Sequence, residues 1–497
     1  MIVSVLLALA ASVPVVPTAL AGVPAVTPGQ RTGKVEGPAS GDQAPSRESR
    51  ARRARRAQAQ REAAQHPGLN RRQGSEDFTL GGALTTSSTG AVATAGPKIA
   101  PGVFQIQLGD PGTGWQESVV LGVPKIRPSG PVPVLVMFHA YDLSELDCYY
   151  NAPDVFEGAR DRGWYVIAPL GAHQVNFGIP YAQTNIEYAL TYFMDKLPID
   201  RDRIYGVGFS MGGGGVMSYA ARHLNPDLPR FAAVVNHTGA VSTANAYWNS
   251  SNTYVFDHPM TFNGSPAAHP FLYSQSSCMD IDQFSFEVNP LTDLARNLAH
   301  VPVLNYHAKY DADTNLVTLT QTAYNWLLGL PGMETYLLTP PVGTHSWSTM
   351  DANTALNYLG SKTLQTPTTG EHFVLADREA KWFHYYVYQD APDAFTPFRW
   401  NYEYALNRLT IDRTENLQRM VVDTLSLGIN TAVNLELVMG SNDGTGDVFT
   451  LSGYAQAPQQ VLRNSVPTSN WTWDSVSQSV TLSESDASGG TLWRVRP

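Results

Sequence analysis

Ser210 stands at the centre of the sequence GFSMG at residues 208–212, which fits the pattern G-x-S-x-G. Residues 204–209 before it are typical of a short apolar strand, and small and apolar residues follow at helical spacing from Met211. A serine on such a strand-to-helix turn is presented as a nucleophile, and the amide of Met211 can stabilise an oxygen that becomes negative. The alternative is a glycine-rich turn whose serine only caps the helix. The strand before the motif and the helix after it favour the nucleophile.

A serine nucleophile needs a histidine that takes its proton and an acid that orients the histidine. When such a site is built on a sheet of parallel strands, the acid and then the histidine follow the serine, each on a loop after a strand. Asp311 follows a predicted strand at 301–307, and His345 follows another at 334–338. Asp313 is a second candidate for the acid, with the alternative role of capping the next helix. Asp311 is favoured because it comes sooner after the strand.

The loop after a predicted strand at 133–138 should supply a second donor to the oxyanion. We assign this donor to the backbone N–H of Tyr141, whose side chain is alternatively a lining group of the substrate pocket. Further candidates for the pocket wall, each equally compatible with ordinary packing, are Asn176, Phe177, Tyr181 and Trp347. Three histidines compete with His345 and are better explained as hydrogen-bonded structural residues: His139, His237 and His307.

The elements that must position these side chains alternate between strand and helix. Expected strands lie at 102–108, 116–123, 133–138, 164–170, 204–209, 231–236, 301–307 and 334–338, and expected helices at 155–162, 185–196, from 211, 315–330 and 377–387. This alternation predicts an α/β fold with a mostly parallel sheet covered on both faces, over residues 98–398. Two long interruptions, at 240–291 and 347–373, are expected to shape the mouth of the site.

From about residue 401 the pattern changes to short β-type segments separated by turn sequences. These segments predict a small all-β module over residues 399–497. Trp471, Trp473 and Trp493 are candidates for either its core or a binding platform, and burial in the core is favoured for tryptophans in so small a module.

The first 21 residues form an apolar run that ends in Ala-Leu-Ala, as expected of a signal peptide. Pro14 and Pro17 argue against the alternative, an uncleaved membrane anchor. We expect residues 22–97, including the arginine-rich run at 50–61, to be a disordered tether, and binding of the run to an anionic surface is the alternative. The chain, with a net charge of −10, is therefore expected to be secreted, periplasmic or at the cell surface, without a nucleic-acid partner and without stable membrane insertion after cleavage.

Cys148 and Cys278 are the only cysteines in the 497 residues. An even pair in an exported protein suggests one disulfide, and two unpaired buried thiols are the alternative. No metal site is expected, because neither C-x-x-C nor H-x-x-x-H spacing occurs.

Four runs, GFSMGGGGVMSYAARH, FAAVVNHTG, HAKYDADTNLV and GTHSW, resemble those of secreted α/β-hydrolase esterases. The similar groups are the extracellular polyhydroxyalkanoate depolymerases and the feruloyl and acetyl-xylan esterases, and the resemblance covers residues 100–390. It implies an α/β-hydrolase fold without metal or organic cofactor, with Ser210 as nucleophile, Asp311 as acid, His345 as base, and the amides of Met211 and Tyr141 as oxyanion donors. The chain departs from these esterases at residue 140, which is alanine where they have glycine.

The leading hypothesis is a secreted serine carboxylic-ester hydrolase that works through an acyl-enzyme on a polymeric or wall-associated ester, either a polyester or an esterified polysaccharide. An exported serine peptidase or acyltransferase on the same three residues is the alternative enzyme. A surface-binding protein without catalytic activity is the alternative from another class. The acyl and alcohol specificity, the ligand of the β module and the oligomeric state stay open.

Overall fold

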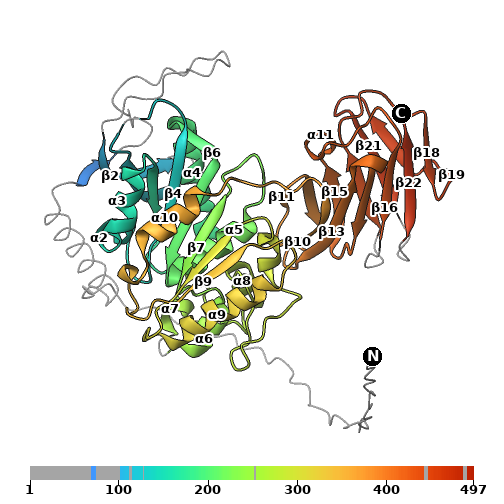
Figure 1. Cartoon of the computed structure of the whole chain (residues 1–497). Coiled ribbons are helices and arrows are strands. Elements are labelled where there is room, and N and C mark those ends of the chain that lie inside the picture. Colours follow the sequence, from blue (N-terminus) through green and yellow to red (C-terminus); the bar gives the residue numbers. More distant parts are fainter. Residues whose placement is uncertain are drawn as a thin grey trace, which may run out of the picture. The chain divides into compact units, whose positions relative to one another are not determined.

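The computed structural model describes residues 69–73, 101–110, 115–126, 128–250, 253–440, 446–484 and 490–497 (Figure 1). The expected signal peptide at 1–21 lies outside these residues, as does the expected tether except for Leu69–Gln73. That segment forms strand β1, so the prediction of disorder is wrong there. Within the described residues, no helix combines the length and apolar character needed to cross a membrane.

The first 360 residues contain a nine-stranded sheet in the order β1-β2-β3-β5-β4-β6-β7-β8-β9. Its strands are β1, β2 (Gly102–Asp110), β3 (Trp115–Val123), β4 (Val132–Phe138), β5 (Tyr165–Pro169), β6 (Ile199–Phe209), β7 (Ala233–His237), β8 (Val303–Tyr306) and β9 (Thr335–Leu338). The pairs of β3 with β2 and β5 are antiparallel, and the others are parallel. The prediction of a mostly parallel sheet is confirmed, and the parallel strands bring the ends of β6, β8 and β9 to one edge.

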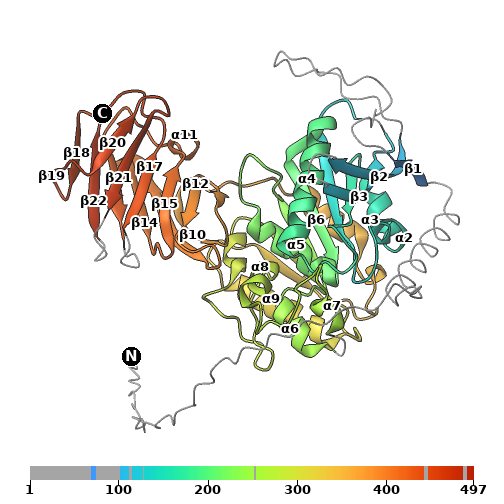
Figure 2. The same ribbon diagram turned by 180° about the vertical axis from the view of Figure 1, so that it is seen from behind.

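Helices cover both faces of this sheet. They are α2 (Asp147–Tyr150), α3 (Pro153–Asp161), α4 (Pro180–Lys196), α5 (Met211–Arg222), α9 (Thr314–Leu328) and α10 (Ala352–Gly360). In β4, Val134 and Val136 pack with α4, α5 and α9, whereas Leu135 and Met137 pack with α3 and α10. This alternation follows from the period of two along a strand. Figure 1 shows α3 and α10 in front of the sheet. Figure 2, seen from the opposite side, shows α4 and α5 on the other face.

The two cysteines lie in cores on opposite faces of the sheet. Cys148 packs in the core with α3 and α10, and Cys278 in the core with α4 and α5. Both thiols are free and buried, and burial raises the pKa of each well above its ordinary value. The predicted disulfide is therefore wrong, because the sheet between the two sites prevents the close approach that a disulfide requires.

The interruption at 240–291 contains three short helices, α6 (Thr243–Asn249), α7 (Tyr254–Asp257) and α8 (Pro270–Ser276). A cluster of mostly aromatic side chains joins this segment to the turn at Ser210 and the start of α5. Its buried members include Phe177, Met211, Phe256, Phe262 and Tyr273. The segment therefore packs directly against the start of α5. A 3-10 helix, η1 (Leu294–Leu298), leads from it to β8.

The rest of the chain forms two β sheets around a second core. One sheet has the order β10-β13-β14-β16-β22-β18-β19 and the other β11-β12-β15-β17-β21-β20. Their strands are β10 (Gly370–Ala376), β11 (Ala380–Trp382), β12 (Tyr385–Gln389), β13 (Thr396–Glu403), β14 (Arg408–Asp412), β15 (Leu417–Val422), β16 (Leu435–Met439), β17 (Asp447–Leu451), β18 (Gln460–Arg463), β19 (Val466–Pro467), β20 (Trp471–Asp474), β21 (Ser479–Glu484) and β22 (Thr491–Arg496), with a short helix α11 (Thr424–Leu427). Trp493 is fully buried in the shared core, and Trp471 and Trp473 are partly buried against it.

Two boundaries differ from the prediction. The helix predicted at 377–387 is wrong, because this segment forms β11 and the start of β12. Tyr385 and Val387 are buried while Tyr386 between them is exposed, which is the alternation of a strand. In so short an apolar run, the sequence alone does not distinguish this alternation from helical spacing. The predicted boundary at 398/399 is also wrong, since β10 already pairs with β13. The all-β region therefore begins near Gly370.

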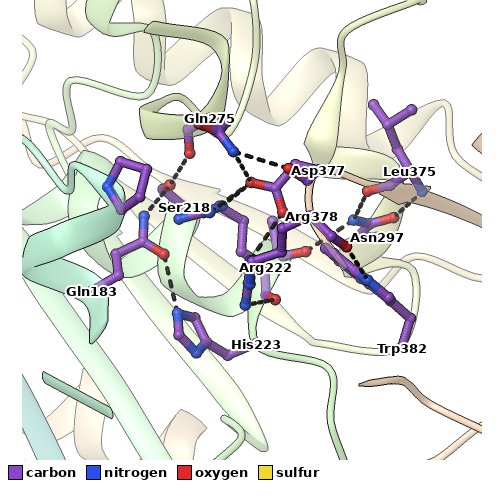
Figure 3. Close-up of polar contacts among 12 residues, drawn as sticks. Gln183, Ser218, Arg222, His223, Gln275, Asn297, Leu375, Asp377, Arg378 and Trp382 are labelled. Carbon is purple, nitrogen blue, oxygen red and sulfur yellow. Dashed lines mark hydrogen bonds and ion pairs between the residues drawn. The ribbon is translucent and has the colours of Figure 1, made fainter. Parts of the chain in front are cut away.

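A buried polar network joins the C-terminal half of α5 to the segment between β10 and β11 (Figure 3). Arg222 contacts Asp377 at 2.6 Å, and both side chains are almost completely buried. Asp377 also accepts a hydrogen bond from Gln275 and pairs with Arg378. Burial alone would raise the pKa of Asp377, but Arg222 and Arg378 outweigh it and lower the pKa. The ionised Asp377 is thus part of the packing of α5.

Candidate functional site

Ser210 lies on the turn between β6 and α5 with φ of 56° and ψ of −120°. A positive φ is uncommon for a residue with a side chain and stores strain, as in a nucleophile elbow. Two glycines permit the turn. A Cβ at Gly208 would collide with the backbone of Gly212, and a Cβ at Gly212 would collide with the carbonyl of Phe138. The turn therefore brings the end of β4 directly against the first residues of α5.

Substitution of Gly212 by alanine should displace residues 138–139 from the elbow, because the new methyl group meets backbone carbonyls that cannot rotate away. We expect Gly212→Ala to lose most activity or to fail to fold. Gly215→Ala is the matched control, since its Cβ would meet the Phe138 ring no closer than 3.4 Å. In a helix interior alanine is favoured over glycine by about 1 kcal/mol, so the control should be active and at least as stable. Thermal unfolding and ester turnover of the two purified variants check this prediction.

His345 and Asp311 complete a chain of hydrogen bonds to the serine. The Nε2 atom of His345 lies 2.9 Å from Ser210 Oγ, and its Nδ1 atom lies 3.1 and 3.0 Å from the two carboxylate oxygens of Asp311. The Asp311 side chain is fully buried, whereas that of His345 is about a quarter exposed at 26%. Because the carboxylate only accepts, the imidazole proton is on Nδ1, and Nε2 can accept the serine proton. The arrangement and the chain order serine, acid, histidine are those of the α/β-hydrolase fold.

Asp313 has the alternative role considered for it. Its side chain caps α9 by accepting a hydrogen bond from the amide of Leu316 at 3.0 Å, and its own amide donates to Asp311 at 2.9 Å. The structure therefore brings Asp311, and not Asp313, to His345. Asp313 instead borders the pocket.

The oxyanion loop, residues 139–143, follows β4 beside the elbow. Three of its amides donate to other acceptors: Ala140 N–H to Asp147 Oδ2 at 2.8 Å, Asp142 N–H to Gln174 O at 3.0 Å, and Leu143 N–H to Ala140 O at 3.3 Å. Tyr141 lies between Ala140 and Asp142 and lines the same pocket as Ser210 and Met211. The amide of Met211, as the first residue of α5, has no acceptor within its own helix. The two residues whose amides are the predicted donors to an oxyanion, Met211 and Tyr141, thus lie at the wall of the pocket that contains Ser210.

A pocket of about 530 Å³ opens beside Ser210 and His345. It is lined by Ala140, Tyr141, Leu143, Phe177, Phe209, Met211, Ala240, Ala246, Asn249, Ser250, Val255, Phe256, Asp313, Asn315 and Leu316. Most of these side chains are aliphatic or aromatic, and none is Lys or Arg. Its wall comes largely from the oxyanion loop, from Phe177 and from helices α6 and α7. The pocket therefore suits an uncharged apolar group.

Three predicted wall residues do not line the pocket: Asn176, Trp347 and Tyr181. Asn176 is buried and holds its own loop, because its amide donates to the carbonyls of Leu170 and His173 and its Oδ1 accepts from Gly178 N–H. Trp347 is buried, with its indole N–H bonded to Asp147. Both predictions of a substrate contact are therefore wrong. Tyr181 is 57% exposed and does not line the pocket either, whereas Phe177 and Tyr141 do.

The competing histidines bond to backbone carbonyls. Nε2 of His139 contacts Leu170 O at 2.8 Å, Nε2 of His237 contacts Ser346 O at 3.0 Å, and Nδ1 of His307 contacts Ala308 O at 3.0 Å. Burial lowers the pKa of His237 to about 4. His237 is therefore neutral at physiological pH and supports the loop that carries His345.

The pKa of His237 predicts an acid-sensitive contribution to stability. Between pH 6.5 and about 4 the unfolded chain binds a proton at this residue and the folded chain does not, so acidification favours unfolding. Across this window we expect wild type to lose about 3 kcal/mol more unfolding free energy than His237→Gln, which cannot titrate. Denaturant unfolding of both proteins at several pH values measures this difference. Parallel pH profiles for the two would contradict the prediction.

Sequence reasoning missed two residues that support the site. Phe209 precedes the serine, and its ring lies 4.6 Å from His345 and 5.5 Å from Trp347, measured between ring centroids. Its position as the variable residue of G-x-S-x-G could have indicated a supporting role. Asp147 hydrogen-bonds to both Ala140 and Trp347, and no local pattern indicates these bonds.

Among the residues that the structure covers, no group of three or more His, Cys, Asp or Glu side chains could hold a metal ion.

Comparisons with known proteins add structural similarities only. No family model matches the sequence, and no curated protein does. An S-formylglutathione hydrolase from Agrobacterium tumefaciens is 16% identical with a TM-score of 0.40, over 55% of this chain and 97% of that chain. A ferulic acid esterase is 18% identical with a TM-score of 0.36, over 50% and 94%. An acylaminoacyl peptidase from Pyrococcus horikoshii is 17% identical with a TM-score of 0.39, over 54% and 42%. Because these values are low, the interpretation of the site depends on its geometry.

Proposed function

We propose that this protein is a serine carboxylic-ester hydrolase that works through an acyl-enzyme. The observation that carries the proposal is the continuous chain of hydrogen bonds from Asp311 through His345 to Ser210 at the wall of an apolar pocket. A histidine whose Nδ1 proton is held by a buried carboxylate has its Nε2 lone pair directed at the serine hydroxyl. Such a base raises the nucleophilicity of the serine without a metal or cofactor.

The reaction has two halves. Ser210 Oγ attacks the carbonyl carbon of the ester while its proton passes to His345 Nε2, and Asp311 stabilises the resulting imidazolium. The amides of Met211 and Tyr141 stabilise the oxyanion, and the collapsing intermediate expels the alcohol, which takes the proton from His345. Water then attacks the acyl-enzyme by the same route and releases the acid.

The substrate class follows from the pocket and from the N-terminal sequence. An uncharged apolar acyl group suits a pocket lined by Leu143, Phe177, Phe256 and Leu316, without basic residues. The apolar run at 1–21 supports export, and export supports an extracellular polymeric or wall-associated ester, either a polyester or an esterified polysaccharide. As part of this proposal, the region of two β sheets after residue 370 attaches the enzyme to such material.

A substrate panel tests this proposal. Purified protein would be given p-nitrophenyl esters of increasing acyl length, blocked peptide amides, polyester films, and acetylated or feruloylated polysaccharides, each with and without an added alcohol as acyl acceptor. We expect ester hydrolysis to exceed peptide hydrolysis and acyl transfer, and neutral acyl groups to exceed carboxylated ones of equal length. Faster turnover of the peptides, or transfer to the alcohol in preference to water, would contradict ester hydrolysis as the function.

A further inference from the structure

Asp147 hydrogen-bonds to both loops that meet at Ser210. Its Oδ2 atom accepts from the backbone N–H of Ala140 at 2.8 Å and from the indole N–H of Trp347 at 3.1 Å. Ala140 belongs to the oxyanion loop. Trp347 belongs to the histidine loop, residues 343–350, and follows His345 by two positions. One buried carboxylate oxygen therefore joins the two loops.

The carboxylate of Asp147 is satisfied by neutral N–H donors. Its Oδ1 atom accepts from the side-chain amide of Asn151 at 2.8 Å, and within the described residues no Lys or Arg forms an ion pair with it. The bonds from Ala140 and Trp347 restrain each donor to 2.8 or 3.1 Å from the same oxygen atom. These two bonds are therefore well suited to hold the two loops at a fixed separation.

The second partner of Asp147 also supports the imidazole. The Trp347 ring packs on Phe209 at 5.5 Å between centroids, and His345 packs on Phe209 at 4.6 Å. Displacement of Trp347 would therefore move the surface on which the imidazole lies. On the other side, displacement of Ala140 would move the adjacent amide of Tyr141.

We propose that Asp147 is a positioning residue that sets the Tyr141 amide and the His345 imidazole in register around Ser210. This inference rests on the proposed function, in which the amide stabilises the oxyanion and the imidazole transfers the proton in the same step. A misplacement of about 1 Å in such a constellation can cost about 100-fold in rate. Asp147 touches neither substrate nor reacting atoms and acts through its two partners.

Asp147→Leu tests the inference, because leucine has a similar branched shape but no oxygen that could accept from Ala140 and Trp347. We expect kcat on a short p-nitrophenyl ester to fall by about 10- to 100-fold, with KM changed less than about twofold. Trp347→Phe keeps an aromatic ring and loses the N–H, so its kcat should fall by a smaller factor. The double variant should be no slower than Asp147→Leu, because both changes break the same connection between the two loops. Asn151→Ala, which removes only the contact to Oδ1, should stay within about twofold of wild type.

Active-site titration with a fluorophosphonate corrects each rate for the folded fraction. A wild-type kcat per titrated site in Asp147→Leu, whatever its melting temperature, would show a purely structural residue and overturn the inference. Additive losses in the double variant would also overturn it. Retention of ester hydrolysis by Ser210→Ala would instead remove the proposed function itself, so the two failures are distinguishable.

Discussion

Ser210→Ala should reduce kcat for ester hydrolysis by roughly 10⁴ to 10⁶, because the covalent route is lost and only substrate binding and the oxyanion amides remain. The hydroxyl at 2.9 Å from His345 Nε2 is the group removed, and the methyl group that remains fits the same turn. We therefore expect the variant to fold normally and to bind substrate. Steady-state kinetics on p-nitrophenyl acetate and butyrate, with near-ultraviolet circular dichroism for the fold, measure this effect.

Two neighbouring carboxylates provide the control for this prediction. Asp311→Asn removes the charge that orients His345 and should reduce kcat by about 10⁴. Asp313→Asn changes the cap of α9, and since asparagine also caps helices well, kcat should be retained. An equal loss in both variants would contradict the assignment of Asp311 as the acid. A Ser210→Ala enzyme with wild-type turnover would contradict the whole mechanism.

Asp377→Asn should destabilise the protein by about 3 to 5 kcal/mol, because removal of one partner leaves the charge of Arg222 buried and uncompensated. The ion pair is 2.6 Å long, with side-chain exposures of 2% and 0%, and Figure 3 shows it between α5 and the segment after β10. Since α5 begins at the elbow, we also expect loss of activity above the new melting temperature. Denaturant unfolding of the purified variant measures the change.

Glu371→Gln, on strand β10 just before Asp377, is the matched control. Its ion pair with Arg399 is 3.0 Å long, but the glutamate is 64% exposed. Loss of such a pair should change stability by less than about 1 kcal/mol. Equal stability of Asp377→Asn and wild type would show that the buried network does not stabilise the contact between α5 and the segment after β10.

Because of the same network, the all-β region cannot be removed without loss of contacts to α5. A chain that ends at residue 369 would lack Asp377 and also Leu375, which packs in the core beside α5 and bonds to Asn297. Such a truncation should therefore fail to give a folded enzyme. A test for attachment to polymers needs substitutions on the surface of the β sheets and cannot rely on removing them.

Much of the catalytic part could be predicted because its signals are local. The elbow is a continuous strand, turn and helix, so Ser210 and Met211 follow from adjacent residues. Asp311 and His345 were found because each comes soon after an apolar strand, where side chains of parallel strands converge. The covered α/β sheet follows from the same alternation.

Other features depend on contacts between distant residues and could not be predicted. Whether Asn176 or Phe177 faces the pocket depends on the turn at Phe177, where φ is 44°. The bond between Asp147 and Trp347 joins residues 200 positions apart. Nothing in the sequence around the two cysteines indicates that a sheet separates them. The short run at 377–387 fits both the helical period of 3.6 and the strand period of two. Sequence patterns specify elements, whereas pairing between elements decides these points.

Acylation of Ser210 by an ester substrate is tested most directly by trapping the acyl-enzyme. Protein mixed with an excess of a slowly deacylating p-nitrophenyl ester would be quenched in acid within milliseconds, and its intact mass and peptides determined. We predict a burst of one p-nitrophenolate per active site and a mass increase of one acyl group, located on Ser210. Hydrolysis without an adduct, or an acyl group on another residue, would contradict the mechanism.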